Sequence, residues 1–250
     1  MISLYLEAPF AACRTFTAGW YRPTAPYLTP SAVYGLLLNV AQVESRLREE
    51  DDRHDGSAAA TLMMPGLPEA ELAIGVPEVQ VRGGRAGTPI PAECLFPRVH
   101  STFQQLHNYP VGASGKDRAA ACKGNKYNIT PVRREYLSNV RAVVNLRGND
   151  ELQQRVLEGL SGKLNSGRYG VPFLGDNSFL PDRMEPLKEP VPVRWYERVT
   201  TSAVGIQDHA ARLTISIDRA DLSKTSSALF APAEIGKCKP EESAWLKVGG

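Results

Sequence analysis

Apolar and polar positions in the first third of the chain follow two different periods. Residues 2–7 alternate apolar and polar side chains, which predicts a strand with one buried face. Thr29 can cap a helix whose first position suits Pro30, and apolar side chains then recur at helical spacing, so we predict a helix over residues 30–47. Residues 71–81 are again typical of a strand, interrupted by one proline.

The middle of the chain loses this periodicity and then regains it. Residues 83–130 contain Gly and Pro throughout, which predicts a long, irregular segment of the kind that usually serves a function. A strand pattern returns at 135–146, and Asn149 or Asp150 can cap a short helix after it. Beyond a glycine-rich turn, further strands are predicted at 193–199 and 212–218.

The order of these elements predicts an α+β fold. Strand, helix, strand, long insertion, strand, helix and strand correspond to a ferredoxin-like βαββαβ core, which RNA-recognition (RRM) domains share. We therefore predict a core domain over residues 1–180 with a thumb-like insertion at about 83–134, and a small C-terminal β extension over 181–250. Such a fold does not by itself establish a function.

Composition places the chain among soluble globular proteins. Of its 250 residues 42% are hydrophobic and 22% charged, which excludes a fibrous or wholly disordered chain. No apolar run reaches the roughly 18 residues of a membrane span, and the N-terminus lacks the basic region of a secretory signal. The cysteines stand singly, so we expect neither a zinc site nor a disulfide framework, and a cytoplasmic location. They are Cys13, Cys94, Cys122 and Cys238.

Charge is distributed unevenly along the chain. The net charge is only +2, but residues 100–148 hold eight basic and two acidic residues, a net charge of +6 that leaves −4 for the remainder. Clustered cations of this kind favour contact with a polyanion. A solvated loop that its lysines keep soluble is the alternative interpretation.

Catalytic motifs are scarce. No histidine has a carboxylate or cysteine at metal-ligand spacing, and there is neither a phosphate-binding P-loop nor a G-x-S-x-G elbow, so we expect no metal and no nucleotide cofactor. His107, with Tyr109 and Lys116, could supply the acid, base and cation of a metal-independent ribonuclease. The alternative is that His107 and Tyr109 pack or stack at the base of a loop.

Interleaved aromatic and arginine side chains near the N-terminus suit single-stranded RNA, whose bases stack on rings while cations hold phosphates. The same residues could instead fill the core and pin a proline-rich loop. A later glycine-rich segment, residues 166–177, can present backbone N–H groups to an anion, or can be a plain turn between helix and strand. The candidate RNA-binding residues here are Arg14, Phe16, Trp20, Tyr21, Arg22, Tyr27 and Arg168.

Three segments in this order carry a resemblance to a known family. Arg14-x-Phe16 followed by residues 27–37, with a P-S-x-x-x-G-L-L pattern, resembles the first-helix motif of the CRISPR-associated Cas-five family of the RAMP superfamily. Residues 133–137 resemble the strand after that family's thumb, and residues 169–179 are similar to its late loop. The resemblance covers about residues 1–180, and the remainder matches nothing we identify.

The resemblance implies a subunit of a type I Cascade complex in antiviral defence. Family members have a ferredoxin-like core and a thumb, seat the 5′ handle of the crRNA, and contact the backbone subunit and the large subunit; target DNA near the PAM is a further implied partner. The thumb would place cations on RNA phosphates, with more arginines at its root. These implied RNA-binding residues are His107, Lys116, Arg118, Lys123, Lys126, Arg133, Arg134 and Arg141.

Most members of the family are not enzymes, but one subfamily cuts precursor crRNA with a Tyr, Lys and His set that includes adjacent Lys and His in the thumb. In this chain Lys116 is followed by Asp117, and no Lys-His dipeptide occurs. We therefore predict a non-catalytic crRNA-binding subunit. A metal-independent endoribonuclease that processes precursor crRNA, and a protein-binding element whose basic insertion docks on acidic neighbours, remain the alternatives.

Overall fold

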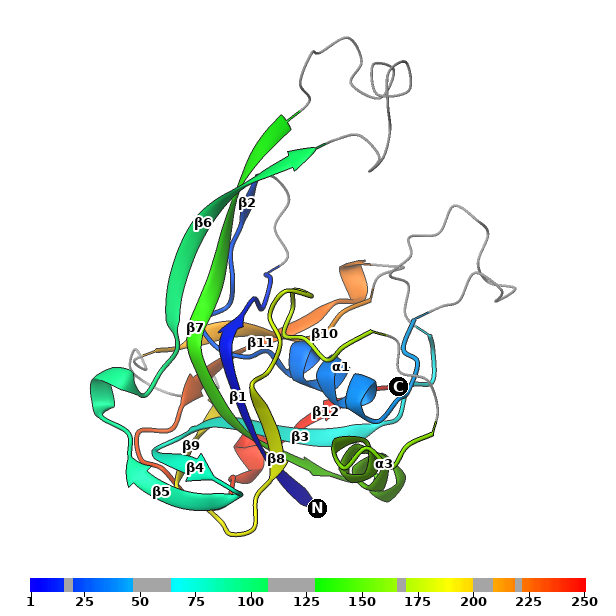
Figure 1. The fold of residues 1–250 in the computed structure, drawn as a ribbon, viewed down its shortest axis with the longest axis vertical. Helices are drawn as coiled ribbons and strands as arrows, with labels where there is room; N and C mark the ends of the chain where they lie inside the picture. Colours follow the sequence, from blue (N-terminus) through cyan, green and yellow to red (C-terminus); the bar gives the residue numbers. More distant parts are fainter. Residues whose placement is uncertain (16–19, 47–63, 108–128, 166–169, 200–208, 219–221) are drawn as a thin grey trace.

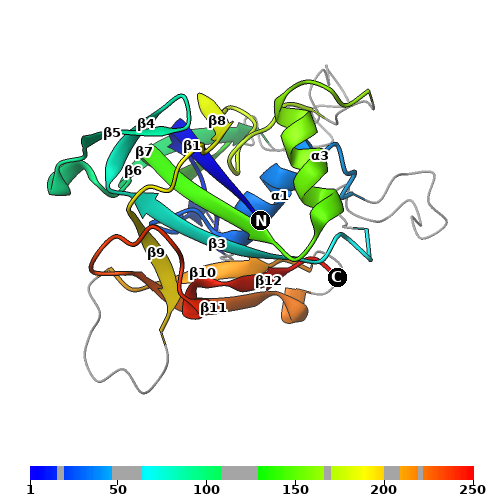
Figure 2. The same cartoon turned by 90° about the horizontal axis from the view of Figure 1, so that it is seen from below.

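One large, mostly antiparallel sheet organises the described part of the chain, where two helices pack on one of its faces (Figures 1 and 2). The structure, a computed structural model, describes residues 1–15, 20–46, 64–107, 129–165, 170–199, 209–218 and 222–250, with the main chain alone at 105–107, 129, 130 and 222. The strands are β1 (Ile2–Ala11), β2 (Tyr21–Arg22), β3 (Ala70–Pro77), β4 (Val79–Arg82), β5 (Arg85–Pro89), β6 (Arg98–His107), β7 (Ile129–Arg147), β8 (Arg183–Pro186), β9 (Val193–Arg198), β10 (Ala211–Ser216), β11 (Ser226–Pro232) and β12 (Leu246–Val248). The helices are α1 (Pro30–Val40) and α3 (Asp150–Leu160), and the 3₁₀ turns are η1 (Ala92–Cys94), η2 (Leu222–Lys224) and η3 (Glu242–Ala244).

In the described residues the sheet has ten strands, and its main path runs β10-β11-β9-β3-β7-β1-β8. β12 pairs with β3, while β2 and β6 both pair with β7. The long β7 therefore pairs with β1, β2, β3 and β6 along its length. β4 and β5 form a separate hairpin. The fold is therefore α+β with a mostly antiparallel sheet, which confirms the predicted class.

The main core lies between the sheet and its two helices. Alternate residues of β1, such as Leu4 and Leu6, face the helices and are fully buried. Leu37 of α1 and Val156 of α3 fill the other side. Phe230 of β11 joins the same core from the far end of the sheet, so the sheet curves around α1 (Figure 2).

A smaller core lies on the opposite face of the sheet. Tyr5 of β1, Val143 of β7 and Trp195 of β9 are buried there beneath Val81 of the β4–β5 hairpin. The Trp195 indole N–H donates to the Lys237 carbonyl at 2.8 Å, which satisfies its one polar atom. The hairpin thus covers this face only in part.

Helix α1 begins as the sequence predicts but ends earlier. The Thr29 hydroxyl accepts a hydrogen bond from the Ala32 amide. The helix stops at Val40 because Gln42 adopts a left-handed φ of 55° and the Val43 amide returns to the Leu38 carbonyl at 2.9 Å. The predicted continuation toward residue 47 is wrong. The sequence gives no signal for this helix end, because the left-handed position is occupied by Gln42, whereas Gly usually occupies it.

The region from residue 83 is more regular than predicted. It contains β5, η1 and the ten-residue strand β6, whereas the sequence pattern indicated an irregular segment. The predicted strand over 135–146 is part of the longer β7. Helix α3 confirms its predicted cap, because the Asn149 side chain accepts from the Leu152 amide at 2.9 Å.

Strands after residue 180 join the same sheet as those before it. β8 pairs with β1, with Arg183 opposite Glu7, and β9 and β12 both pair with β3. β10 and β11 extend the sheet beyond β9. The C-terminal segment is therefore all strands and short turns in the described ranges and is hydrogen-bonded to the N-terminal part.

Candidate nucleic-acid interface

β6 and the first half of β7 form an arm that rises away from the body (Figure 1). β2 runs parallel to β7 on the other side, with Tyr21 opposite Arg133 and Arg22 opposite Arg134. We call residues 98–107, 129–138 and β2 the arm. It falls within and beside the segment for which the sequence predicts a thumb.

One face of the arm presents aromatic and guanidinium groups. The Arg133 guanidinium lies 5.4 Å from the centre of the Tyr21 ring, and its Nε donates to Ser101 Oγ at 3.3 Å. Phe103, the register partner of Arg133 on β6, is 72% exposed on this face, and Trp20, which precedes Tyr21 in the chain, is 62% exposed. Such a face offers flat surfaces beside a cation.

The Tyr21 phenol on this face is held by a carboxylate. Its hydroxyl donates to Glu135, whose other oxygen accepts from the Thr24 amide at 3.2 Å. This hydrogen bond to Glu135 raises the pKa of Tyr21 above its ordinary value. Tyr21 is therefore a neutral stacking group at physiological pH, and its one O–H is already donated to Glu135.

The opposite face of the arm carries an ion pair that ties it to a loop of the body. Arg134 pairs with Asp176 and also donates to Gln104 Oε1 at 2.6 Å, and Arg14 Nη2 lies 3.9 Å from the same carboxylate. Arg134 and Asp176 are only 17% and 12% exposed. Burial raises the pKa of Asp176, but hydrogen bonds from the Ser178 amide and Arg134 outweigh it and hold that pKa below its usual range.

The loop that carries Asp176 is fixed on β1. The Ala12 amide donates to the Leu174 carbonyl at 2.9 Å, and the Leu174 amide donates to the Phe179 carbonyl at 2.9 Å. Gly175 has a φ of 77°, and a Cβ there would lie 1.7 Å from the Ala12 carbonyl oxygen, so the close approach requires glycine. The glycine-rich segment therefore has a structural role at this position.

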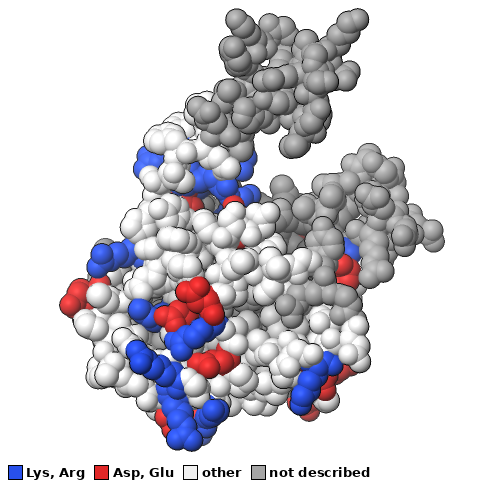
Figure 3. Space-filling view, viewed as in Figure 1, with Lys and Arg blue, Asp and Glu red and all other residues white. Residues whose placement is uncertain are grey.

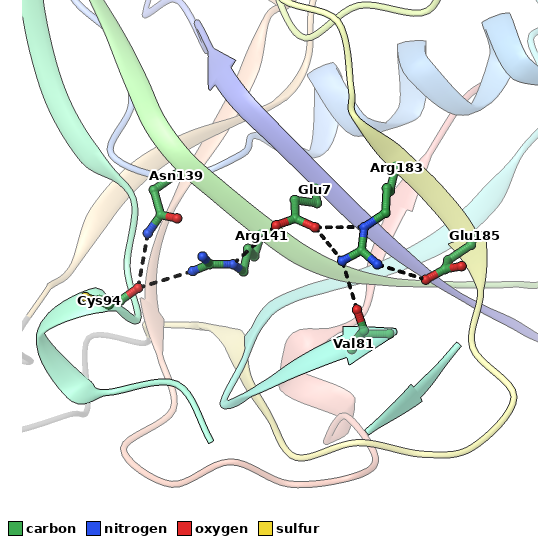
Figure 4. Close-up of polar contacts among 7 residues, drawn as sticks. All are labelled: Glu7, Val81, Cys94, Asn139, Arg141, Arg183 and Glu185. Atoms are coloured by element: carbon green, nitrogen blue, oxygen red, sulfur yellow. Dashed lines mark hydrogen bonds and ion pairs between the residues drawn. The ribbon is translucent and has the colours of Figure 1, made fainter. Parts of the chain in front are cut away.

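Arg141 lies on the body and not on the arm (Figure 4). Its Nε is 3.7 Å from Glu7, its Nη1 contacts the Cys94 carbonyl at 3.5 Å, and it is 18% exposed. Glu7 also binds Arg183, which donates to the Val81 carbonyl at 2.8 Å. This network joins β1, β7 and β8 to the β4–β5 hairpin, so the charge of Arg141 is largely neutralised.

Basic side chains gather in several places on the face seen in Figure 3: at the root of the arm, over the centre of the sheet, and near the β4–β5 hairpin. Acidic side chains accompany the central group, as the Glu7 network requires. Among the residues that the structure describes, no three His, Cys, Asp or Glu side chains are placed to hold a metal ion. No helix in the same residues is long and apolar enough to cross a membrane.

The structure brings together most of the predicted residues that it describes. Arg14, Trp20, Tyr21, Arg22, Arg133 and Arg134 all lie on or against the arm, whereas Arg141 lies apart and Tyr27 is buried in the main core. Only the main chain of His107 is described, in β6. Outside the described residues lie Phe16, Tyr109, Lys116, Arg118, Lys123, Lys126 and Arg168.

Sequence reasoning missed Asp176, which organises the arm's root, because the carboxylate is 42 residues from Arg134 along the chain. It also missed the rings of Phe10, His100, Tyr136 and Phe179, which meet on the face that carries Arg134. No local sequence pattern marks this cluster, because its four rings lie on β1, β6, β7 and the loop that carries Asp176.

The fold and the arm define a class: an α+β protein with a mostly antiparallel sheet and a projecting hairpin that displays rings and guanidinium groups. The chain belongs to the family described as CRISPR-associated protein (Cas_Cas5), whose model matches residues 1–222. This confirms the resemblance to the Cas-five family and corrects its extent, since the match continues past residue 180.

A solved chain of a "CRISPR RNA-guided surveillance complex" superimposes with a TM-score of 0.49 at 15% identity, covering 97% of this chain and 95% of that chain. No curated protein matches the sequence.

Proposed function

We propose that this chain is the crRNA-binding subunit of a type I CRISPR Cascade complex and that its arm holds the 5′ handle of the guide RNA. The observation that carries the proposal is on the arm: in the described part of the chain, neither Arg22 nor Arg133 has a carboxylate within ion-pair distance, and Arg133 lies beside exposed rings. Cations without a protein counter-charge suit phosphates, and the rings suit unpaired bases.

Membership of the Cas-five family supports the same assignment. So does the topology: β3, β7, β1 and β8 are neighbours in the sheet, with α1 between β1 and β3 and α3 between β7 and β8 along the chain. We propose that these six elements are the ferredoxin-like core and that the arm is an insertion in it. The backbone subunit, the large subunit and target DNA near the PAM are the proposed partners.

The proposed role is non-catalytic. The nuclease alternative depends on His107, Tyr109 and Lys116, whose side chains lie outside the described part of the structure. It predicts a discrete cut in repeat RNA in the presence of EDTA that is lost in His107→Ala. We expect intact RNA after incubation with the pure chain, and such a cut would replace the proposal with the endoribonuclease.

The binding role is tested by the salt dependence of affinity. The double variant Arg22→Ala/Arg133→Ala removes two cations from the arm, and Arg212→Ala/Lys247→Ala removes two exposed cations from β10 and β12 as a charge-matched control. Affinity for a single-stranded RNA with the handle sequence is measured from low to moderate salt. Each lost phosphate contact lowers the log–log slope by about 0.7, so the arm variant should lose about 1.4 and the control nothing.

Equal slopes for the wild type and the arm variant would overturn the proposal. An equal loss in both variants would also do so, because it would show a response to net charge in place of binding by the arm.

A further inference from the structure

Four aromatic rings from four separate parts of the chain meet at the root of the arm. Phe10 comes from the end of β1, His100 from β6, Tyr136 from β7, and Phe179 from the loop that carries Asp176. His100 and Tyr136 are stacked, with ring centres 5.4 Å apart and planes inclined by 23°. Phe10 meets Tyr136 edge to face at 5.5 Å, and Phe179 lies 5.8 Å from Phe10 and 6.0 Å from Tyr136.

This cluster is not part of either hydrophobic core. Phe10 is 42% exposed and His100 is exposed, and none of the four rings belongs to the apolar clusters on the two faces of the sheet. Single exposed rings are ordinary, but four in contact on one surface form a continuous patch of a kind that usually marks a binding site.

The rings are also held in place. His100 Nε2 lies 2.7 Å from Ser138 Oγ, and the register sets His100 directly opposite Tyr136 on the neighbouring strand. Phe179 is fixed because its amide donates to the Asp176 carbonyl at 2.9 Å. A platform ordered in advance loses little side-chain entropy when a flat ligand stacks on it.

The surroundings favour a nucleobase with its phosphate. Arg98 is opposite Ser138 and therefore on the same face as His100, it is exposed, and it makes no ion pair with any described residue. Arg134 follows Tyr136 on this face, but Asp176 neutralises it. The imidazole, the phenol and the neighbouring guanidinium can stack on and pair with an aromatic, anionic ligand. They are less suited to binding the aliphatic surface of another protein.

We propose that Phe10, His100, Tyr136 and Phe179 form a stacking platform for one unpaired base of the bound RNA, and that Arg98 contacts the phosphate next to that base. The proposal rests on the proposed function, because it assumes that RNA lies along the arm. It adds a second contact surface, on the face opposite Tyr21 and Arg133.

The experiment couples a change in the protein to a change in the RNA. Affinities of the full chain are measured by fluorescence anisotropy for the handle RNA and for a series in which each base in turn is replaced by an abasic site. His100→Leu removes the exposed ring while keeping its volume, and Phe10→Leu serves as a second variant. Val99→Ala changes an exposed side chain on the other face of the same strand and is the matched control.

We expect one abasic position to weaken binding to the wild type about 10-fold. His100→Leu should bind intact RNA about as weakly as the wild type binds that abasic RNA, and should show no further loss with it. Val99→Ala should behave as the wild type. Circular dichroism and thermal unfolding confirm that the variants are folded.

The outcomes separate this proposal from the proposed function. If the wild type binds RNA with the expected salt slope but no abasic position is coupled to either His100 or Phe10, the platform is wrong and the arm assignment stands. A flat abasic series of this kind is also what a protein-docking patch predicts. If the wild type binds no RNA at low salt, both proposals fail.

Discussion

Replacing Asp176 by Asn should lower the free energy that holds the loop of residue 176 against the root of the arm. The contacts of the carboxylate give the size of this loss. The carboxylate binds Arg134, lies 3.9 Å from Arg14, and accepts from the Ser178 amide at 3.0 Å. Asn keeps the shape and one acceptor but removes the charge, so Arg134, only 17% exposed, loses its counter-ion. A hydrogen bond to a charged group contributes about 1.5–3 kcal/mol, and we expect a loss of about 2 kcal/mol.

Hydrogen exchange at neutral pH measures this loss where it occurs. The Leu174 and Phe179 amides donate to carbonyls within the loop, and the Ala12 amide, directly after β1, donates to the Leu174 carbonyl. A decrease of about 2 kcal/mol in the free energy of loop opening makes their exchange roughly 30-fold faster. Asp182→Asn is the control, because this exposed side chain belongs to no ion pair in the described part of the chain.

The pH dependence provides a second measurement. The folded-state pKa of Asp176 is lowered, so the ion pair stabilises the protein above about pH 4 and is lost as pH falls through the folded value. The difference in thermal midpoint between the wild type and Asp176→Asn should therefore be present at pH 7 and shrink toward pH 3. Unchanged exchange at pH 7, or a difference of equal size at both pH values, would refute the reasoning.

Two further predictions concern the body of the protein. A Cβ on Gly159 of α3 would lie 1.9 Å from the Val40 carbonyl oxygen, so Gly159→Ala should lower the free energy of unfolding by about 1–3 kcal/mol in urea titrations. Gly35→Ala in α1, where the space is open, is the control and should not lower it. Burial raises the pKa of the Cys13 thiol to about 11, so peptide mapping after alkylation at pH 8 should find Cys13 unmodified and the exposed Cys238 modified; equal labelling of the two would contradict this.

Local sequence rules predict the elements whose signals are themselves local. The start of α1 follows from Thr29 and Pro30, and the start of α3 from Asn149, because a cap and its amide are three residues apart. β1 follows from the alternation of apolar and polar residues, because Leu4, Leu6 and Ala8 all face the main core. These elements can be found without any knowledge of the rest of the chain.

β6 was missed for the opposite reason. Among the described strands it pairs only with β7, and the described side chains on both of its faces, from Arg98 to Gln104, are exposed. No face is buried, so no alternation of apolar and polar residues marks the strand. Its stability comes from main-chain pairing with β7, which a sequence pattern does not record.

At the candidate site, the sequence also does not show how many cations of the basic segment are available to RNA, because their protein partners lie elsewhere in the chain. Three of its eight cations, Arg134, Arg141 and Arg147, pair with carboxylates that lie outside residues 100–148, on Asp176, on Glu7, and on Glu71 with Glu242. Counter-ion release counts the phosphates that a protein neutralises and not the basic residues that it contains. Folding has already neutralised those three arginines, so they release no counter-ions when RNA binds. At about 0.7 per phosphate contact, a log–log salt slope of RNA affinity derived from the sequence alone is therefore too steep by about 2.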